Sequence, residues 1–277
     1  MGFVEDNYSV PWELLGEGSR RTDAQMRVTD PWYRLRMERT LALIDFPTSD
    51  SIVVLDLGCG TGPYDFTLAR RWLGAHITGV DINQQQVDFA RDMAGKLALS
   101  NRLDFICADV TSFIPRGAHD VVLLTDIVEH MQDPRLCLAT AHTAVRAGGQ
   151  VIVSVPSTSR PKKDWWFYRQ MLPDGTFAMA DTPEKLNPTR PILRYWHKEY
   201  AADELAALLS ESGFGLIKFI LCRFDYRYLR RRCLPVLRRL LDIFSDGKRA
   251  FKPELDKVAC AVMPCWAKTC IMVAARR

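Results

Sequence analysis

The chain lacks the usual marks of a secreted, metal-ribbon or membrane-spanning protein. Its eight cysteines form no CxxC pair, and Cys59, Cys107 and Cys137 lie in apolar or glycine-rich segments, which disfavours a disulfide framework and a zinc ribbon. The first residues, MGFVEDNYSV, contain no apolar run, and Pro264 and Lys268 interrupt the apolar stretch near the carboxyl end. We therefore expect reduced thiols and a cytoplasmic location.

Charge and composition are also unremarkable for a globular protein. The formal net charge is only +4, which by itself does not indicate a nucleic-acid partner. Hydrophobic residues make up 48% and charged residues 25% of the 277 residues, and there are no internal repeats. This length fits one large α/β domain with additions.

The hydrophobic pattern alternates between strands and helices. Seven strands are expected, at 51–57, 76–82, 102–110, 120–126, 150–156, 214–224 and 266–276. Asn83 is placed to cap the second helix of this series, and Asp133 with Pro134 to open a later one that Gly148 and Gly149 close. The alternation predicts an α/β fold with a doubly wound, mostly parallel seven-stranded sheet.

Three segments do not follow this alternation of strands and helices. We expect an amino-terminal helical arm at 1–50, followed by the main domain at 51–277. Within that domain, an insertion at 157–196 is long enough to act as a lid, and an arginine-rich segment covers 223–250.

Polar groups gather where the predicted strands end. Gly58, Gly60 and Gly62 follow the first strand, and their missing side chains let the backbone approach a ligand. Asp56, just before them, is placed to hold an ammonium group, and Asp81 ends the second strand, where a carboxylate takes the two hydroxyls of a ribose. These positions indicate a nucleoside-containing ligand.

The spacing of the glycines separates two classes of ligand. A dinucleotide fingerprint fails because Pro63 occupies the place of the third glycine, which leaves GxGxG. A carboxylate beside the loop would repel a diphosphate but suits a ligand that carries an amino acid. Asp109, at the end of the third strand, is then placed to accept from an adenine amino group.

The stretch DLGCGTG, with Asp81 and Asp109, resembles the class I S-adenosylmethionine-dependent methyltransferases, over Val54 to Pro156 and on to the helix ending at Gly213. The resemblance implies a Rossmann-like methyltransferase fold and S-adenosyl-L-methionine as cofactor. It also implies cofactor contacts at Asp56, Gly58, Cys59, Gly60, Gly62, Asp81, Ile82, Asp109, Val110 and Thr125.

The acceptor side allows two interpretations. In the first, His130 or His197 is a general base and Glu129 polarises the acceptor, and the segment DIVEHMQDP resembles the small-molecule O-methyltransferases of quinone biosynthesis. In the second, Asp126 joins these three residues in holding a divalent metal, which resembles the ExxEH motif of small-RNA 2′-O-methyltransferases with Asp126 in place of the first Glu. We favour the base and assign no metal ligand.

Two further segments bear on the acceptor. Trp165, Trp166 and Tyr195 in the insertion, beside lysine and arginine, suit an aromatic, lipid-like or anionic acceptor, although they could equally form a small core of their own. The arginine-rich segment fits an anionic membrane surface, a nucleic-acid backbone or an ordinary solvated face. We favour peripheral membrane contact over nucleic acid because no RNA-binding module accompanies it.

Three functions therefore stay open. The first is methyl transfer to a small-molecule or lipid-like acceptor, at a hydroxyl oxygen because no NPPY tetrad or Pro-Cys motif follows the fourth strand. The second is an RNA 2′-O-methyltransferase. The third is a non-catalytic module that binds S-adenosylmethionine.

Overall fold

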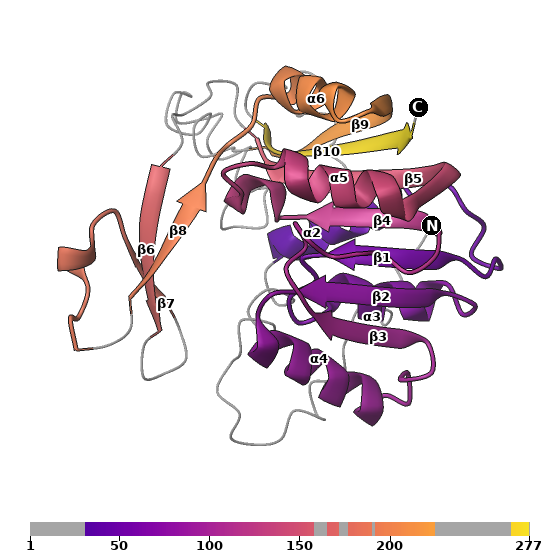
Figure 1. Ribbon diagram of the computed structural model, residues 1–277, viewed down its shortest axis with the longest axis horizontal. Coiled ribbons are helices and arrows are strands. Elements are labelled where there is room, and N and C mark those ends of the chain that lie inside the picture. The colour runs from indigo at the N-terminus through magenta and orange to yellow at the C-terminus, as the bar shows by residue number, and fades with distance from the viewer. Residues whose placement is uncertain (1–30, 158–164, 172–176, 190–191, 225–266, 277) are drawn as a thin grey trace, which may run out of the picture.

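A computed structural model describes residues 31–157, 165–171, 177–189, 192–224 and 267–276. Within these ranges a seven-stranded sheet has the order β3-β2-β1-β4-β5-β10-β9, and β10 alone runs antiparallel to its two neighbours (Figure 1). The strands are β1 Val53–Leu57, β2 His76–Asp81, β3 Leu103–Cys107, β4 His119–Thr125, β5 Val145–Pro156, β9 Phe214–Phe224 and β10 Ala267–Arg276. The predicted doubly wound, mostly parallel sheet is confirmed.

Helices cover both faces of this sheet. The helices are α2 Pro31–Leu41, α3 Pro63–Arg71, α4 Gln84–Lys96, α5 Arg135–Ala144 and α6 Ala202–Glu211. Side chains of α2, α3 and α4 form one core with Val54 and Leu123, whereas α5 and α6 pack with Leu55 and Val122. Successive strand residues thus point into opposite cores, as strand geometry requires.

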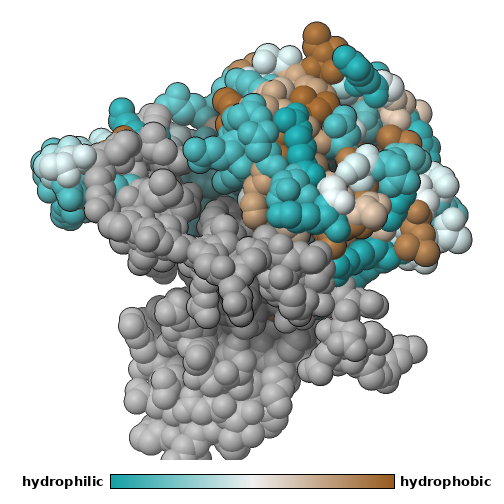
Figure 2. Space-filling model, turned by 90° about the horizontal axis from the view of Figure 1, so that it is seen from below, coloured by the Kyte–Doolittle hydropathy of each residue, from teal (hydrophilic) through white to brown (hydrophobic). Residues whose placement is uncertain are grey.

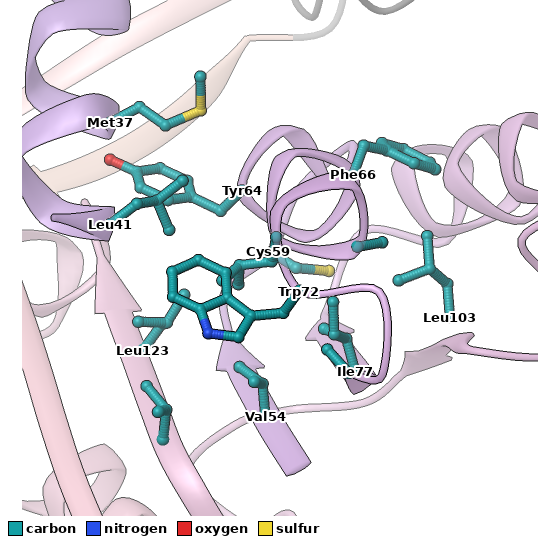
Figure 3. Close-up of a cluster of buried hydrophobic side chains, with 14 of the residues drawn as sticks. Met37, Leu41, Val54, Cys59, Tyr64, Phe66, Trp72, Ile77, Leu103 and Leu123 are labelled. Carbon is teal, nitrogen blue, oxygen red and sulfur yellow. The ribbon is translucent and has the colours of Figure 1, made fainter. Parts of the chain in front are cut away.

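Helix α2 is part of the first core. Figure 3 shows Met37 and Leu41 of this helix close to the ring of Tyr64, and all three side chains are almost fully buried. Burying a side chain of this size contributes roughly 1.5–3 kcal/mol. The described part of the amino-terminal arm is therefore fixed to the domain by apolar packing.

Local signals in the sequence mark the starts of three helices, α3, α4 and α5. The side chain of Asn83 accepts from the backbone N–H groups of Gln85 and Gln86 and so caps α4, as predicted. Pro63 occupies the first turn of α3, and the carboxylate of Asp133 accepts from the N–H of Arg135 at the start of α5.

The carboxyl end of α5 differs from the prediction. The helix ends at Ala144, and Gly148 and Gly149 lie inside β5 rather than closing the helix. A Cβ atom on Gly149 would lie 2.9 Å from the backbone oxygen of Asp120, at an irregularity in the pairing of β4 with β5. Gly149 therefore permits a close approach of two strands.

The insertion contains a second, three-stranded antiparallel sheet in the order β7-β6-β8. Its strands are β6 Trp165–Met171, β7 Phe177–Ala180 and β8 Leu193–His197. In Figure 1 it lies on the side of the main sheet toward which β1, β2 and β4 point. The backbone N–H of Tyr200 donates to the carbonyl of Pro156 over 3.2 Å, which fixes the end of the insertion to β5.

Some sequence-based expectations fall outside the described residues, namely most of the arm, 1–30, and most of the arginine-rich segment, 225–250. No helix within the described ranges is long and apolar enough to cross a membrane. On the face drawn in Figure 2, the described part of the surface carries hydrophobic residues interspersed with hydrophilic ones. The described cysteines Cys59, Cys107, Cys137 and Cys270 are free thiols, as expected.

Candidate functional site

The glycine turn after β1 is a tight, strand-anchored loop. Its first two backbone N–H groups, from Gly58 and Cys59, both donate to the carbonyl of Val80, over 2.7 and 3.1 Å. Gly58, Gly60 and Gly62 have φ angles of 86°, 58° and 78°, in the left-handed region that glycine tolerates best. A Cβ atom at Gly58 would also lie 2.3 Å from the side chain of Ile127, so this position has no room for one.

Asp81 fixes the loop to the end of β2. One carboxylate oxygen accepts from the N–H of Gly60 and the other from the N–H of Asn83, each over 2.8 Å. Next to it, Ile82 is 70% exposed, which leaves an apolar side chain open to a ligand ring. The end of β2 thus presents a carboxylate and, next to it, an exposed apolar side chain.

Asp109 and Val110 follow β3 at the neighbouring strand end. The carboxylate of Asp109 is exposed and accepts from the backbone N–H and the hydroxyl of Thr111. Val110 is buried in the core that also contains α5 and α6. Asp109 continues the row of acidic strand ends that begins at β1.

Asp56 forms an acidic pair with Asp65, a residue that the sequence did not single out. Its carboxylate and that of Asp65, in the first turn of α3, are completely buried, and none of their oxygen atoms has a hydrogen-bond partner in the described structure. Neither has an ion pair among the described residues. Burial, followed by the charges of Asp65 and Asp81, raises the pKa of Asp56 well above its ordinary value, and burial raises the pKa of Asp65 to about 7. The surroundings of this pair therefore disfavour two negative charges side by side.

The end of β4 carries a second buried charge cluster. Thr125 is buried, and Asp126 has a φ of 56° while its N–H donates to the carbonyl of Ser154 over 2.9 Å. The carboxylate of Asp126 pairs with the guanidinium of Arg36, from α2. Sequence reasoning missed Arg36 because nothing in its local pattern distinguishes it from a solvent-exposed helix residue.

Glu129, His130 and His197 lie together where the second sheet meets the main domain. Glu129 and His130 belong to the short helix η3, Val128–His130, and Glu129 is only 1% exposed. The Nε2 atom of His130 is 4.0 Å from a carboxylate oxygen of Glu129, and the two histidine rings are 5.3 Å apart. The candidate catalytic side chains are therefore neighbours, although α5, β5, β6 and β7 lie between His130 and His197 along the chain.

The hydrogen bond of His130 also selects its tautomer. Its Nδ1 atom lies 3.1 Å from the carbonyl oxygen of Trp196, which can only accept. The neutral imidazole consequently carries its proton on Nδ1 and has a lone pair on Nε2. This arrangement is suited to a general base.

The structure does not assemble the ligand set of the metal alternative. Asp126 is engaged by Arg36, and in the described ranges no three His, Cys, Asp or Glu side chains lie close enough together to hold a metal ion. The residues present thus fit an acid–base site better than an octahedral or tetrahedral cation site.

The predicted acceptor aromatics occupy the second sheet. Trp165 of β6 pairs with His197 of β8, and Tyr195 pairs with Phe167, but the side chains of Trp165, Trp166 and Tyr195 lie outside the described part of the structure. A cavity of about 230 Å³ lies nearby, between the end of β8, α5 and α6. Trp196, Lys198 and Tyr200 line it, and none of the expected cofactor contacts does.

Comparison of the sequence with known proteins finds similarity to methyltransferases. Residues 48–206 match the model of a family described as a methyltransferase domain. The ubiquinone biosynthesis O-methyltransferase of Aeromonas salmonicida (strain A449) is 34% identical over 131 residues, which cover 47% of this chain and 52% of that protein. The pavine N-methyltransferase of Thalictrum flavum subsp. glaucum is 29% identical over 140 residues, which cover 48% and 39%.

The chain spans about half, or less, of the length of these curated relatives. Among solved structures, the [4+2]-cyclase SpnF has a TM-score of 0.55 and 22% identity, with 88% of this chain and 83% of that chain covered. At 22% sequence identity this similarity indicates a shared fold and no shared activity, and the name of the matched protein describes a cyclase.

Proposed function

The chain belongs to the methyltransferase domain family, and from that premise we propose that it transfers a methyl group from S-adenosyl-L-methionine to a hydroxyl oxygen of a small-molecule or lipid-like acceptor. The observation that carries the proposal is the row of carboxylates at the ends of β1 and β2 and after β3, beside a loop of left-handed glycines. An acidic, backbone-lined site of this kind suits a cationic nucleoside ligand.

The residues of the donor side fit this cofactor. The buried pair Asp56 and Asp65 gives an ammonium group two carboxylates. Asp81 offers its carboxylate to the ribose hydroxyls, and Asp109 accepts from the adenine amino group, with Ile82 and Val110 as apolar contacts. Gly58, Cys59, Gly60 and Gly62 contribute backbone, and Thr125 lines the side where the methyl group is transferred.

The chemistry divides between cofactor and protein. When bound, S-adenosylmethionine supplies a methyl carbon activated by its sulfonium. The protein has to position the acceptor in line and remove the proton of its hydroxyl. We propose that Nε2 of His130 accepts the hydroxyl proton of the acceptor, since the carbonyl of Trp196 fixes the tautomer of this histidine. The carboxylate of Glu129 then stabilises the imidazolium that forms, and the ring of His197 lies beside that of His130.

The remaining acceptor contacts are assigned to the second sheet. We propose that Trp165, Trp166 and Tyr195 bind the acceptor and that this sheet acts as a lid, since it lies on the side to which the parallel strands point (Figure 1). Peripheral membrane contact through the arginine-rich segment stays a prediction. The alternative functions, an RNA 2′-O-methyltransferase and a non-catalytic module that binds S-adenosylmethionine, also stay predictions.

Methylation of a small amine is a second candidate, because the curated relatives include N-methyltransferases as well as O-methyltransferases. A neutral amine attacks through an existing lone pair and needs no base before the transfer, whereas a hydroxyl does. The cluster of Glu129, His130 and His197 favours the hydroxyl.

The two candidates are separated by one variant and two probes. We would measure S-adenosylhomocysteine formation with 3,4-dihydroxybenzoate as the phenol and tetrahydroisoquinoline as the amine. Loss of a general base lowers a rate by about 10²–10⁴-fold, so His130→Ala should abolish turnover of the phenol and leave cofactor affinity unchanged. His76→Ala, at the exposed start of β2, is the matched control.

The outcomes are distinct. Turnover of the amine alone, unaffected by His130→Ala, would establish the second candidate. Cofactor binding without turnover of any acceptor would favour the non-catalytic module, and absence of cofactor binding would contradict the whole proposal.

A further inference from the structure

The cavity of about 230 Å³ between the end of β8, α5 and α6 has no part in the proposed methyl transfer. Its lining includes none of the expected cofactor contacts, and Glu129, His130 and His197 do not line it either. One water molecule takes about 30 Å³ in the liquid, so a space of this size also accepts a small organic molecule. The cavity is therefore a candidate for a second binding site.

More than half of the described residues that line the cavity are apolar or aromatic. Trp196, at the end of β8, and Tyr200, in the segment that leads to α6, provide aromatic rings, and Leu208 of α6 provides an aliphatic surface. Tyr200 and Leu208 are buried, and Tyr200 also belongs to the core that contains α5 and α6. Such a lining favours a ligand with a flat apolar body.

The charged side chains of the lining form two ion pairs with the same orientation. Nζ of Lys198 is 2.5 Å from a carboxylate oxygen of Glu204, and Nη2 of Arg135 is 2.7 Å from one of Glu211. Both acids belong to α6 and lie two helical turns apart, hence on one face of this helix. The cations come from the residue after β8 and from the start of α5. The lining thus carries carboxylates on the α6 side, cations on the other side, and no net charge.

The pair of Lys198 and Glu204 can take further partners. One carboxylate oxygen of Glu204 contacts Lys198, whereas the other is buried without a hydrogen-bond partner in the described structure. A buried acceptor in this state is costly, so an N–H group brought by a ligand would stabilise it. Nζ of Lys198 lies 4.6 Å from the centre of the Tyr200 ring, which shows that an aromatic ring and a cation already meet at this wall.

We infer that the cavity binds a small aromatic zwitterion, a molecule that carries an ammonium and a carboxylate on an aromatic body, as an aromatic amino acid does. Its ammonium pairs with Glu204, its carboxylate pairs with Lys198, and its ring lies against the aromatic lining. The side chains of this ion pair are 25% and 37% exposed, and a pair so accessible to water contributes little, so a ligand separates it at low cost. A ligand with only one charge would leave either Glu204 or Lys198 without its partner.

The site adjoins the proposed reaction centre without being part of it. The carbonyl of Trp196 lies 3.1 Å from Nδ1 of His130, and the backbone N–H of Lys198 donates to the carbonyl of Glu129 over 2.9 Å. Trp196 and Lys198 both line the cavity. A molecule bound there therefore contacts the segment that holds η3 in place, and this binding does not require that the protein transfer a methyl group.

Three probes that share a phenyl ring test the inference on the protein without cofactor. L-Phenylalanine carries both charges, phenethylamine only the ammonium and hydrocinnamate only the carboxylate. In NMR titrations L-phenylalanine should bind at one saturable site, at least about 10-fold more tightly than either other probe, because each of those lacks one hydrogen bond between charged groups. Glu204→Gln, which keeps the size and removes the charge, should weaken L-phenylalanine about 10-fold.

A pair of matched variants assigns the binding to this cavity. Ala207 lines the cavity and is exposed on α6, so Ala207→Trp should fill the space and abolish the binding of L-phenylalanine while the protein stays folded. Ala147→Trp makes the same substitution at an exposed position of β5 that does not line the cavity, and this variant should bind like the unmodified protein.

The inference is overturned if L-phenylalanine does not bind, if it binds no more tightly than the probes with a single charge, or if a folded Ala207→Trp binds it as well as Ala147→Trp does. Should Ala207→Trp fail to fold, Glu204→Gln and the series of probes still decide. S-adenosylmethionine affinity, measured on the same samples, separates the two proposals: its absence in the unmodified protein would refute the proposed function and leave the result with L-phenylalanine valid.

Discussion

The buried pair of Asp56 and Asp65 makes the stability of the cofactor-free protein depend on pH. In the unfolded chain an aspartate ionises near its ordinary pKa of about 4, whereas burial raises the pKa of Asp65 in the folded protein to about 7. Between these values Asp65 alone gives the folded state one more proton than the unfolded state. Stability is therefore greatest below about pH 4 for this group, falls as pH rises toward 7, and levels off above it.

The size of the effect follows from this linkage. One extra proton bound by the folded state costs about 1.4 kcal/mol of unfolding free energy for each unit of pH, and this slope halves as the pH reaches the pKa of Asp65, so the loss between pH 5 and pH 7 is roughly 2 kcal/mol. For a domain of this size, 1 kcal/mol corresponds to about 2–4 °C in Tm. The contribution of Asp65 is thus a fall in Tm of roughly 4–8 °C across that interval.

Asp65→Asn removes this titration while keeping a side chain that donates to Asp56. Thermal unfolding of the cofactor-free variant between pH 5 and pH 8 should give a flatter profile than the unmodified protein, with a higher Tm at pH 8. Asp104→Asn, which changes an exposed acid of β3, should follow the unmodified profile. Parallel profiles for Asp65→Asn and the unmodified protein would refute the reasoning.

Three further predictions concern the elements that shape the site, each measured by urea unfolding. Gly58→Ala should cost about 2–4 kcal/mol, because it combines a left-handed backbone with a clash against Ile127, whereas Gly117→Ala, which has a similar φ but nothing within 4 Å, should cost only the backbone part, about 1–2 kcal/mol. Leu41→Ala should cost about 2–5 kcal/mol, since this fully buried side chain anchors α2 in the core. Asn83→Ala should cost about 1 kcal/mol through loss of the cap of α4, and an unchanged midpoint would show that the cap is dispensable.

The main sheet and the donor side could be predicted from the sequence because both depend on local signals. Buried strands are short apolar runs, and the last residue of each lies at the same edge of a parallel sheet, so Asp56 and Asp81 could be placed together before any coordinates were known. The turn glycines are likewise marked by their residue type, and their positive φ angles confirm the predicted turn.

The acceptor side could not be predicted in the same way because it depends on contacts between distant segments. Arg36 meets Asp126 only after α2 has packed on the sheet, and Asp65 becomes significant only because burial places it against Asp56. The end of α5 was predicted wrongly since Gly149 serves a close approach to Asp120, a constraint that the helix pattern does not contain. The carbonyl of Trp196, which fixes the tautomer of His130, leaves no mark in the sequence at all.

Binding of S-adenosylmethionine tests the central claim, that the acidic strand ends hold the methyl donor. Calorimetry should detect one bound cofactor per chain in the unmodified protein. Asp81→Ala should weaken it about 10–100-fold, because a hydrogen bond to a charged group is worth about 1.5–3 kcal/mol. Asp104→Ala removes the same charge from an exposed position and should bind like the unmodified protein. Equal affinities of the Asp81→Ala variant and the unmodified protein, or no binding to either, would contradict the account.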